Sequence, residues 1–185
     1  MDTVTTLPRS RPLRVADLAV LPDDGHRYEL LDGSLLVTPS PSWGHQSVVV
    51  RLCRLLDDAR PPGLMVLVAP FDVVLSDDTV LQPDVLVARR NDLVAHGHSA
   101  PPLLAVEVLS PSTRRIDQLL KPARYAASGI ASYWIVDQAG PSLVAYELDS
   151  DGTYQETATV RGDELFSTEE PFTITFTPSD LVIDA

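Results

Sequence analysis

Residues 103–108 read Leu-Leu-Ala-Val-Glu-Val, an apolar run with the length of a strand and a single acid inside it. Short apolar runs bounded by turn signals are typical of buried strands. An ionised carboxylate within such a run is costly unless it is paired or bound to a metal. The stretch therefore predicts a core strand, and it makes Glu107 either a site residue or the partner of an arginine.

The segments on either side of this run predict a sheet with helices packed on it. Further strand-length apolar runs occupy residues 64–69, 71–75, 85–88, 133–137 and 142–147, and residues 28–37 predict a hairpin turning at Asp32-Gly33. Helical spacing of apolar residues predicts helices over 43–60 and about 115–128, the second closed by Gly129. This order predicts an α/β (α+β) fold of the restriction-endonuclease-like kind, a mixed β-sheet core flanked by helices, with extra C-terminal strands over 153–176.

Composition limits the organisation and the partners of the chain. A length of 185 residues with 44% hydrophobic residues predicts one domain over 13–185, preceded by a disordered tail over 1–12. No apolar run approaches the roughly 20 residues of a membrane helix, and residues 1–12 carry no apolar signal region, so we expect a cytoplasmic protein without a membrane partner. The net charge of −12 disfavours a protein that grips nucleic acid through a broad basic face, whereas a metal site requires acids.

A second acid precedes a neighbouring strand. Pro83-Asp84 stands at the entrance to the run 85–88, and the run containing Glu107 is the next one of that kind along the chain. If the two strands are adjacent, both carboxylates reach one place, where hard oxygen ligands suit Mg²⁺ or Mn²⁺. Taken alone, Asp84 is equally explained as a turn residue.

The predicted helix after Glu107 carries a polar stripe. Asp117, Lys121 and Tyr125 follow one another at i, i+4 spacing and therefore share a face, which is either solvated or part of a site. Lys121 is the only lysine among 14 basic residues. Lysine shifts its pKa readily, whereas arginine stays protonated, so the pattern favours Lys121 as a catalytic base or a charge stabiliser.

Four other residues are weighed in the same way. Glu29 interrupts an apolar run and faces either the site or solvent. His45, near the start of the first long helix, is expected to be solvated in preference to capping the helix or contacting substrate. His96 and His98 lack further ligands at matching spacing, so a zinc site is not expected.

Several of these motifs together resemble the Uma2 family of restriction-endonuclease-like proteins, members of the PD-(D/E)XK nuclease fold group. The resemblance extends over about residues 18–147. It rests on Tyr28-Glu29-Leu30-Leu31-Asp32-Gly33, on Gln82-Pro83-Asp84-Val85, on Val106-Glu107-Val108-Leu109-Ser110-Pro111-Ser112-Thr113, on Asp117 with Lys121 and Tyr125, and on Gly129-Ile130 followed by Tyr133-Trp134-Ile135-Val136-Asp137.

The resemblance implies a role for each candidate. Mg²⁺, replaceable by Mn²⁺, would be held by Asp84, Glu107 and the carbonyl of Val108, with Glu29 assisting. The family pattern places a lysine at the position that Leu109 occupies here, and Lys121 from the following helix would replace it, although Pro122 leaves the direction of Lys121 open. The remaining expected substrate contacts are Arg114, Arg115 and Tyr125.

The function expected from these residues is a Mg²⁺-dependent endonuclease that hydrolyses phosphodiester bonds in DNA. A homodimer would bring two sites to the two strands of a duplex. The alternative is a catalytically inactive nuclease-fold module for binding or regulation, which the acidic charge and the displaced lysine favour. A weaker alternative is an enzyme that acts on another phosphodiester or on a small molecule.

Overall fold

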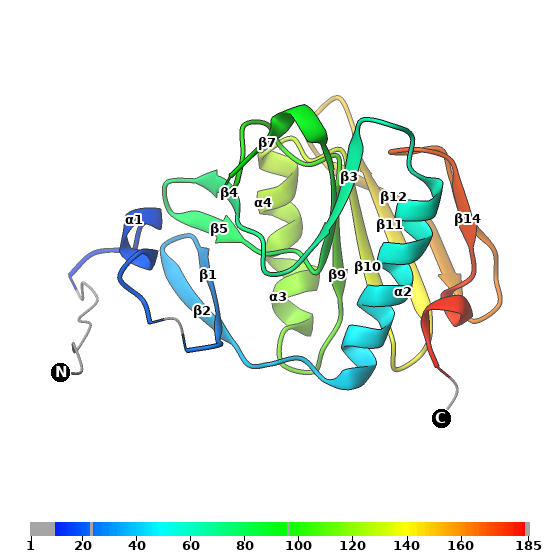
Figure 1. Cartoon of the computed structure of the whole chain (residues 1–185), viewed down its shortest axis with the longest axis horizontal. Coiled ribbons are helices and arrows are strands. Elements are labelled where there is room, and N and C mark those ends of the chain that lie inside the picture. Colours follow the sequence, from blue (N-terminus) through cyan, green and yellow to red (C-terminus); the bar gives the residue numbers. More distant parts are fainter. Residues whose placement is uncertain (1–9, 23, 96, 184–185) are drawn as a thin grey trace.

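The computed structural model describes residues 10–22, 24–95 and 97–183 (Figure 1). Its helical elements are α1 (Val15–Leu18), α2 (Trp43–Ala59), α3 (Arg114–Leu119), α4 (Lys121–Ala127) and the 3-10 turns η1 (Arg90–Asp92) and η2 (Pro178–Leu181). Its strands are β1 (Arg27–Leu31), β2 (Ser34–Thr38), β3 (Leu64–Val68), β4 (Val73–Ser76), β5 (Thr79–Leu81), β6 (Val85–Arg89), β7 (Leu93–Val94), β8 (Gly97–His98), β9 (Leu104–Val108), β10 (Ser132–Asp137), β11 (Ser142–Leu148), β12 (Tyr154–Arg161), β13 (Phe166–Thr168) and β14 (Ile174–Phe176).

The centre of the fold is a six-stranded mixed sheet in the order β12-β11-β10-β9-β6-β3. Strands β9 and β10 are parallel, and the other neighbouring pairs are antiparallel. A second sheet, in the order β2-β1-β5-β4, lies at one end of it (Figure 1). The predicted mixed sheet is confirmed. Of the predicted C-terminal edge strands, only β12 joins the large sheet, whereas β13 and β14 pair with each other.

Alternation along the strands divides the interior into two cores. Val106 belongs to the core that contains Leu52 of helix α2, whereas Ala105 belongs to the core that contains Tyr125 of helix α4. Successive side chains of a strand point to opposite faces. Glu107 therefore points to the same face as Ala105, the face that α4 covers.

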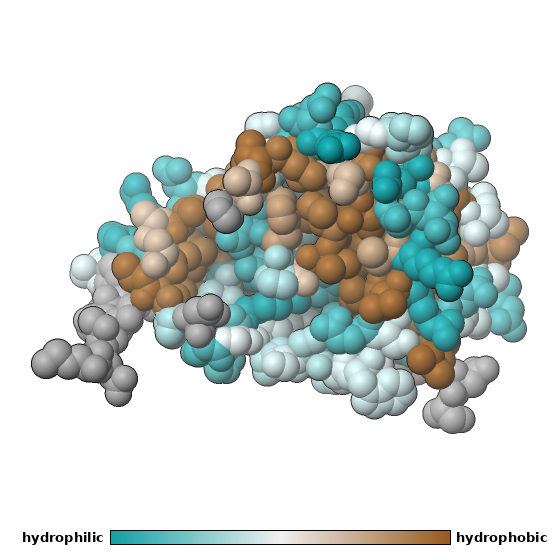
Figure 2. Space-filling model, viewed as in Figure 1, coloured by the Kyte–Doolittle hydropathy of each residue, from teal (hydrophilic) through white to brown (hydrophobic). Residues whose placement is uncertain are grey.

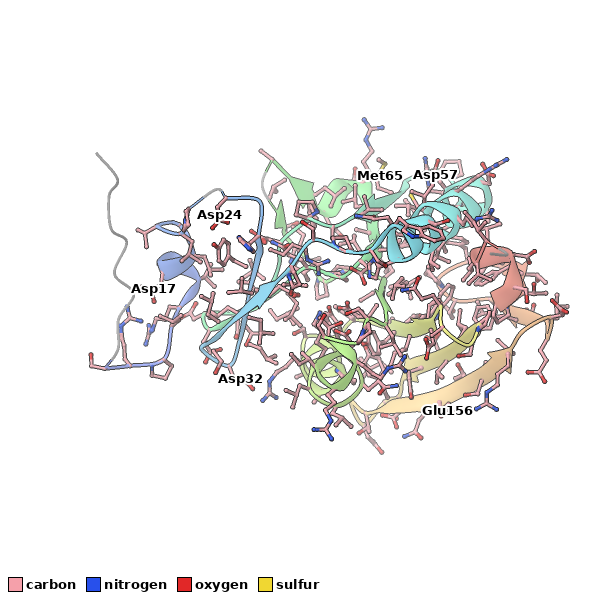
Figure 3. The ribbon with its side chains drawn as sticks, turned by 90° about the horizontal axis from the view of Figure 1, so that it is seen from below. Asp17, Asp24, Asp32, Asp57, Met65 and Glu156 are labelled. Atoms are coloured by element: carbon pink, nitrogen blue, oxygen red, sulfur yellow. The ribbon has the colours of Figure 1, made fainter. Side chains whose placement is uncertain are left out.

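The hairpin β1–β2 has the predicted turn. Asp32 and Gly33 both have positive φ, 50° and 74°, as a two-residue turn of this kind requires. Gly33 also lies against Pro12, so a Cβ atom would collide with the proline ring. The tip of the hairpin lies beside helix α4 (Figure 3), where Arg124 donates two hydrogen bonds of 2.6 Å to the Asp32 carboxylate.

The first described residues already pack on the domain. Arg11 forms an ion pair of 2.8 Å with Asp17, and Leu13 donates a backbone hydrogen bond to Gly33. Residues 1–9 of the predicted disordered tail lie outside the described residues, as does His96.

The predicted helix over 115–128 is in fact two helices. Helix α3 ends at Leu119, α4 begins at Lys121, and Leu120 between them has φ −107° and ψ −48°. The cause is Pro122, which cannot continue a helix interior but fits the first turn of a new helix. The restart places Lys121 at the beginning of α4.

The surface is uneven in polarity. Hydrophobic side chains gather over β3 in the view of Figure 2, and hydrophilic ones cover the outer face of α2. Within the described ranges, none of the helices combines the length and the apolar character that crossing a membrane requires.

Candidate functional site

Asp84 and Glu107 face each other across neighbouring strands. Strands β6 and β9 pair Val85 with Val106, so the same antiparallel register sets Asp84 opposite Glu107. Both side chains are buried, with exposed fractions of 5% and 2%. The structure therefore brings together the two acids that the sequence singled out.

Asp84 is held by three donors. Its Oδ1 accepts a hydrogen bond of 2.8 Å from Arg27, and its Oδ2 accepts one of 2.9 Å from the backbone N–H of Val108. The Nε2 atom of His45 lies 3.1 Å from the same Oδ2. Burial alone would raise the pKa of Asp84, but the contact with His45 and the charge of Arg27 lower it to about 2. Asp84 is therefore ionised at neutral pH.

His45 is not the solvated residue that its position near a helix start predicted. Its exposed fraction is 6%, and its backbone N–H donates to Ser42 Oγ, which caps helix α2. The first turn of the helix is thereby directed into the site, so the ring of His45 reaches Asp84.

Lys121 is buried among three carboxylates. Its Nζ lies 2.9 Å from Oε1 of Glu107, 3.2 Å from Oε1 of Glu29 and 3.2 Å from Oδ1 of Asp117. Burial would lower the pKa of Lys121, but these three charges outweigh it and raise the pKa above its ordinary value. The lysine is therefore a fixed cation, and the restart of the helix at Pro122 directs it into the site.

The remaining member of the polar stripe supports Glu107. Tyr125 is fully buried, and its hydroxyl donates a hydrogen bond of 2.7 Å to Oε1 of Glu107. Glu29 reaches the cluster from strand β1 of the second sheet. Its Oε1 accepts a hydrogen bond of 2.8 Å from the backbone N–H of Gln82.

The site has more acids than fixed cations. Four buried carboxylates face two permanent cations, and if all four are ionised two negative charges stay unbalanced; the acids are Glu29, Asp84, Glu107 and Asp117, and the cations are Arg27 and Lys121. Burial is the main cause that raises the pKa of Glu107 and of Asp117, and Lys121 opposes it. The cluster therefore requires a bound proton or an added cation.

The chemistry of the donors fits a divalent ion. Within the described part of the chain, no three His, Cys, Asp or Glu side chains are arranged to hold a metal together. The carboxylates of Asp84 and Glu107 with the carbonyl of Val108 nevertheless supply hard oxygen donors at the point of excess negative charge. Water would have to complete the coordination shell.

The expected substrate contacts differ in their surroundings. Arg114 is half-buried and donates to Asp137 at 2.8 Å, whereas Arg115 is exposed. Tyr125 is enclosed behind Glu107, and so its hydroxyl serves that carboxylate instead of the surface.

Sequence reasoning missed Arg27. It precedes Glu29 by two positions in β1, so strand alternation places both side chains on one face, and this signal was available. Besides Asp84, Arg27 contacts the carbonyl of Gln82 at 2.7 Å and lies 3.7 Å from Glu29. It connects the small sheet to Asp84, which directly precedes strand β6 of the large sheet.

Two cavities meet at this cluster. The smaller, of about 190 Å³, is lined by Glu29, Glu107 and Lys121, and the larger, of about 440 Å³, extends beneath the hairpin. Arg27 and Asp84 line both cavities.

The fold matches a solved structure, and the sequence matches a protein family. The crystal structure of a "putative nuclease belonging to DUF820" from Anabaena variabilis superposes with a TM-score of 0.76, at 18% sequence identity, over 92% of this chain and 97% of that one. No curated protein matches the sequence. Residues 15–181 match the model of the Uma2 family, described as "Putative restriction endonuclease". The chain belongs to the Uma2 family.

Proposed function

We propose that this chain is a metal-dependent endonuclease that hydrolyses phosphodiester bonds in DNA, with Mg²⁺ as the ion and Mn²⁺ as a substitute. The observation that supports it most is the buried pair Asp84 and Glu107, opposite each other on adjacent strands, with Lys121 at 2.9 Å from Glu107. Such clusters of buried, perturbed acids beside a cavity are typical of catalytic sites.

Each residue has a distinct task in this proposal. Asp84, Glu107 and the carbonyl of Val108 would hold the ion, which when bound polarises a phosphoryl oxygen and lowers the pKa of a water molecule. Lys121, kept protonated by its three carboxylates, stabilises negative charge that develops on the phosphate and cannot act as the base. Glu29 holds the ammonium from the opposite side.

Substrate positioning falls to the surroundings of the site. Arg115 is exposed and Arg114 is half-buried on α3, so both are suited to flanking phosphates. Tyr125 acts indirectly by orienting Glu107. We also propose a homodimer for cleavage of both strands of a duplex.

The test is cleavage of plasmid and short oligonucleotides in Mg²⁺ or Mn²⁺ by the wild type, Asp84→Ala and Lys121→Ala, with Asp57→Ala as an exposed acidic control. We expect activity in the wild type and the control only. Equal residual cleavage in all four proteins would mean contamination and would refute the proposal. Circular dichroism verifies that the variants are folded.

The second candidate is an inactive module for binding or regulation. It is favoured by one observation: Arg27 and Lys121 bind oxygens of Asp84 and Glu107, the carboxylates that a metal would need. The two candidates differ in their response to divalent ions. Thermal stabilisation by Mn²⁺ that disappears in Glu107→Ala supports the enzyme, and no shift in the wild type supports the module.

A further inference from the structure

The larger cavity lies beside the carboxylate cluster but has no role in the proposed cleavage step. Its volume of about 440 Å³ lies between the β1–β2 hairpin, the first half of α2 and the segment that joins β3 to β4. Arg27, His45 and Asp84 form the wall that it shares with the carboxylate cluster. A ligand in this cavity would therefore lie directly beside Asp84.

Three residues that line the cavity carry a buried polar atom with no partner among the described residues. One of these atoms is Nε of Arg27, and the other two belong to Gln82 and His45. The first of these two is Oε1 of Gln82, a side chain with an exposed fraction of 9%. The Nε2 atom of Gln82 donates to Oδ1 of Asp72 at 2.8 Å, and because a carboxylate only accepts, this contact fixes the orientation of the amide. The side-chain oxygen of Gln82, Oε1, is therefore fixed in place and can only accept a hydrogen bond.

The second atom is Nδ1 of His45. The other ring nitrogen faces the Asp84 carboxylate at 3.1 Å and must carry a proton to donate to it. Buried polar atoms are normally paired, and those left unpaired call for a ligand or an ordered water. Three such atoms in residues that line one cavity favour a binding site there.

Part of the remaining lining is apolar and suits a ligand with apolar faces. Apolar lining is supplied by Pro39, Pro41, Pro70 and Val49, and the residues His26 and Tyr28 also border the cavity. Aromatic rings and apolar surfaces stack on nucleobases, whose edges carry N–H donors and acceptors suited to Gln82 and His45. The volume is in the range of pockets for single small ligands and excludes a duplex.

We propose that this cavity binds the base of one unpaired nucleotide next to the phosphate that is cut, so that the substrate class is single-stranded or frayed nucleic acid. The inference rests on the proposed nuclease function. It also explains how a chain with a net charge of −12 retains a nucleic acid, because stacking and hydrogen bonding do not depend on neutralising many phosphates.

The first experiment measures binding without cleavage. Wild-type protein, free of metal, is titrated with 2′-deoxyadenosine and with 2-deoxyribose, and NMR follows the side-chain amide of Gln82. We expect the nucleoside to bind at least about tenfold more tightly than the sugar, and Gln82→Met to lose about tenfold, the effect of one buried hydrogen bond. Equal binding of nucleoside and sugar would overturn the inference.

A second variant fills the cavity and leaves the residues of the carboxylate cluster unchanged. Gln46 is exposed on α2 at the rim of the cavity, so Gln46→Trp should block it, whereas Val50→Trp, one turn further along the helix, is the matched control. We expect Gln46→Trp to abolish nucleoside binding and Val50→Trp to keep it. Unchanged binding in both would contradict the assignment of the cavity.

The second experiment uses cleavage in Mn²⁺ of single strands, blunt duplexes and single strands in which one abasic position is moved along the chain. The wild type should cut single strands at least about tenfold faster than duplexes, and an abasic position beside the cut should remove this advantage. In Gln46→Trp the advantage should already be absent, so the abasic position should change nothing there. Equal cutting of all three substrates overturns the base pocket and leaves the nuclease standing. A wild type that cuts nothing but binds 2′-deoxyadenosine supports the pocket and overturns the nuclease.

Discussion

Replacing the single lysine by an apolar residue of similar length, Lys121→Met, tests the central arrangement. The ammonium lies within 3.2 Å of three carboxylates, and every side chain involved has an exposed fraction of 2% or less. Removing one partner of a buried ion pair costs about 3–5 kcal/mol, since the remaining charge stays buried without compensation. We expect this loss in the free energy of unfolding at pH 8, measured without metal by urea titration and the fluorescence of the buried Trp134.

The loss should depend on pH in a defined direction. Burial raises the pKa of Glu107 and Asp117, and Lys121 opposes the rise, so both pKa values increase further in the variant. Carboxyl groups with a raised folded-state pKa are destabilising once the pH exceeds their ordinary pKa, and they become neutral and harmless in acid. The cost of Lys121→Met should therefore be smaller at pH 5 than at pH 8.

Arg124→Met on the same helix is the matched control. Arg124 pairs with Asp32, and both side chains are about half exposed. Exposed pairs contribute about 0–1 kcal/mol, so this variant should lose little, with no comparable change between pH 5 and pH 8. A loss for Lys121→Met as small as that for Arg124→Met at both pH values would refute the buried cluster.

Three further variants test other parts of the structure. Arg27→Gln removes the cation that holds Oδ1 of Asp84 and should raise Mn²⁺ affinity about tenfold, measured by electron paramagnetic resonance of free Mn²⁺; weaker binding would contradict this competition. Asp84→Asn should lose about 2 kcal/mol in the free energy of unfolding at pH 7, because the folded-state pKa of Asp84 is about 2 instead of 3.8. That stability is present above the ordinary pKa and is lost toward pH 2. A difference between wild type and variant that stays constant in acid would be evidence against it. Gly33→Ala should lower the melting temperature more than Gly152→Ala, since both glycines have positive φ but only Gly33 lies against Pro12; equal losses would exclude that contact.

Much of the fold follows from local patterns. Strand-length apolar runs and the Asp32-Gly33 turn appear in the structure where the sequence predicted them. The short strands β5, β7 and β8 were missed because runs of two or three residues carry no periodicity. The predicted single helix failed at Pro122, where backbone geometry outweighs apolar spacing.

The sequence by itself determined that Asp84 precedes one buried strand, that Glu107 lies near the end of another, and that the only lysine shares a helix face with Asp117. Those features depend on periods of two and of about four residues, which a linear pattern contains. That the two strands are neighbours was decided by the tertiary structure. Only the tertiary structure decided that Arg27 and His45 bind Asp84, from positions 57 and 39 residues away. Contacts at such separations depend on how the two sheets and helix α2 pack, and packing leaves no fixed spacing in the chain.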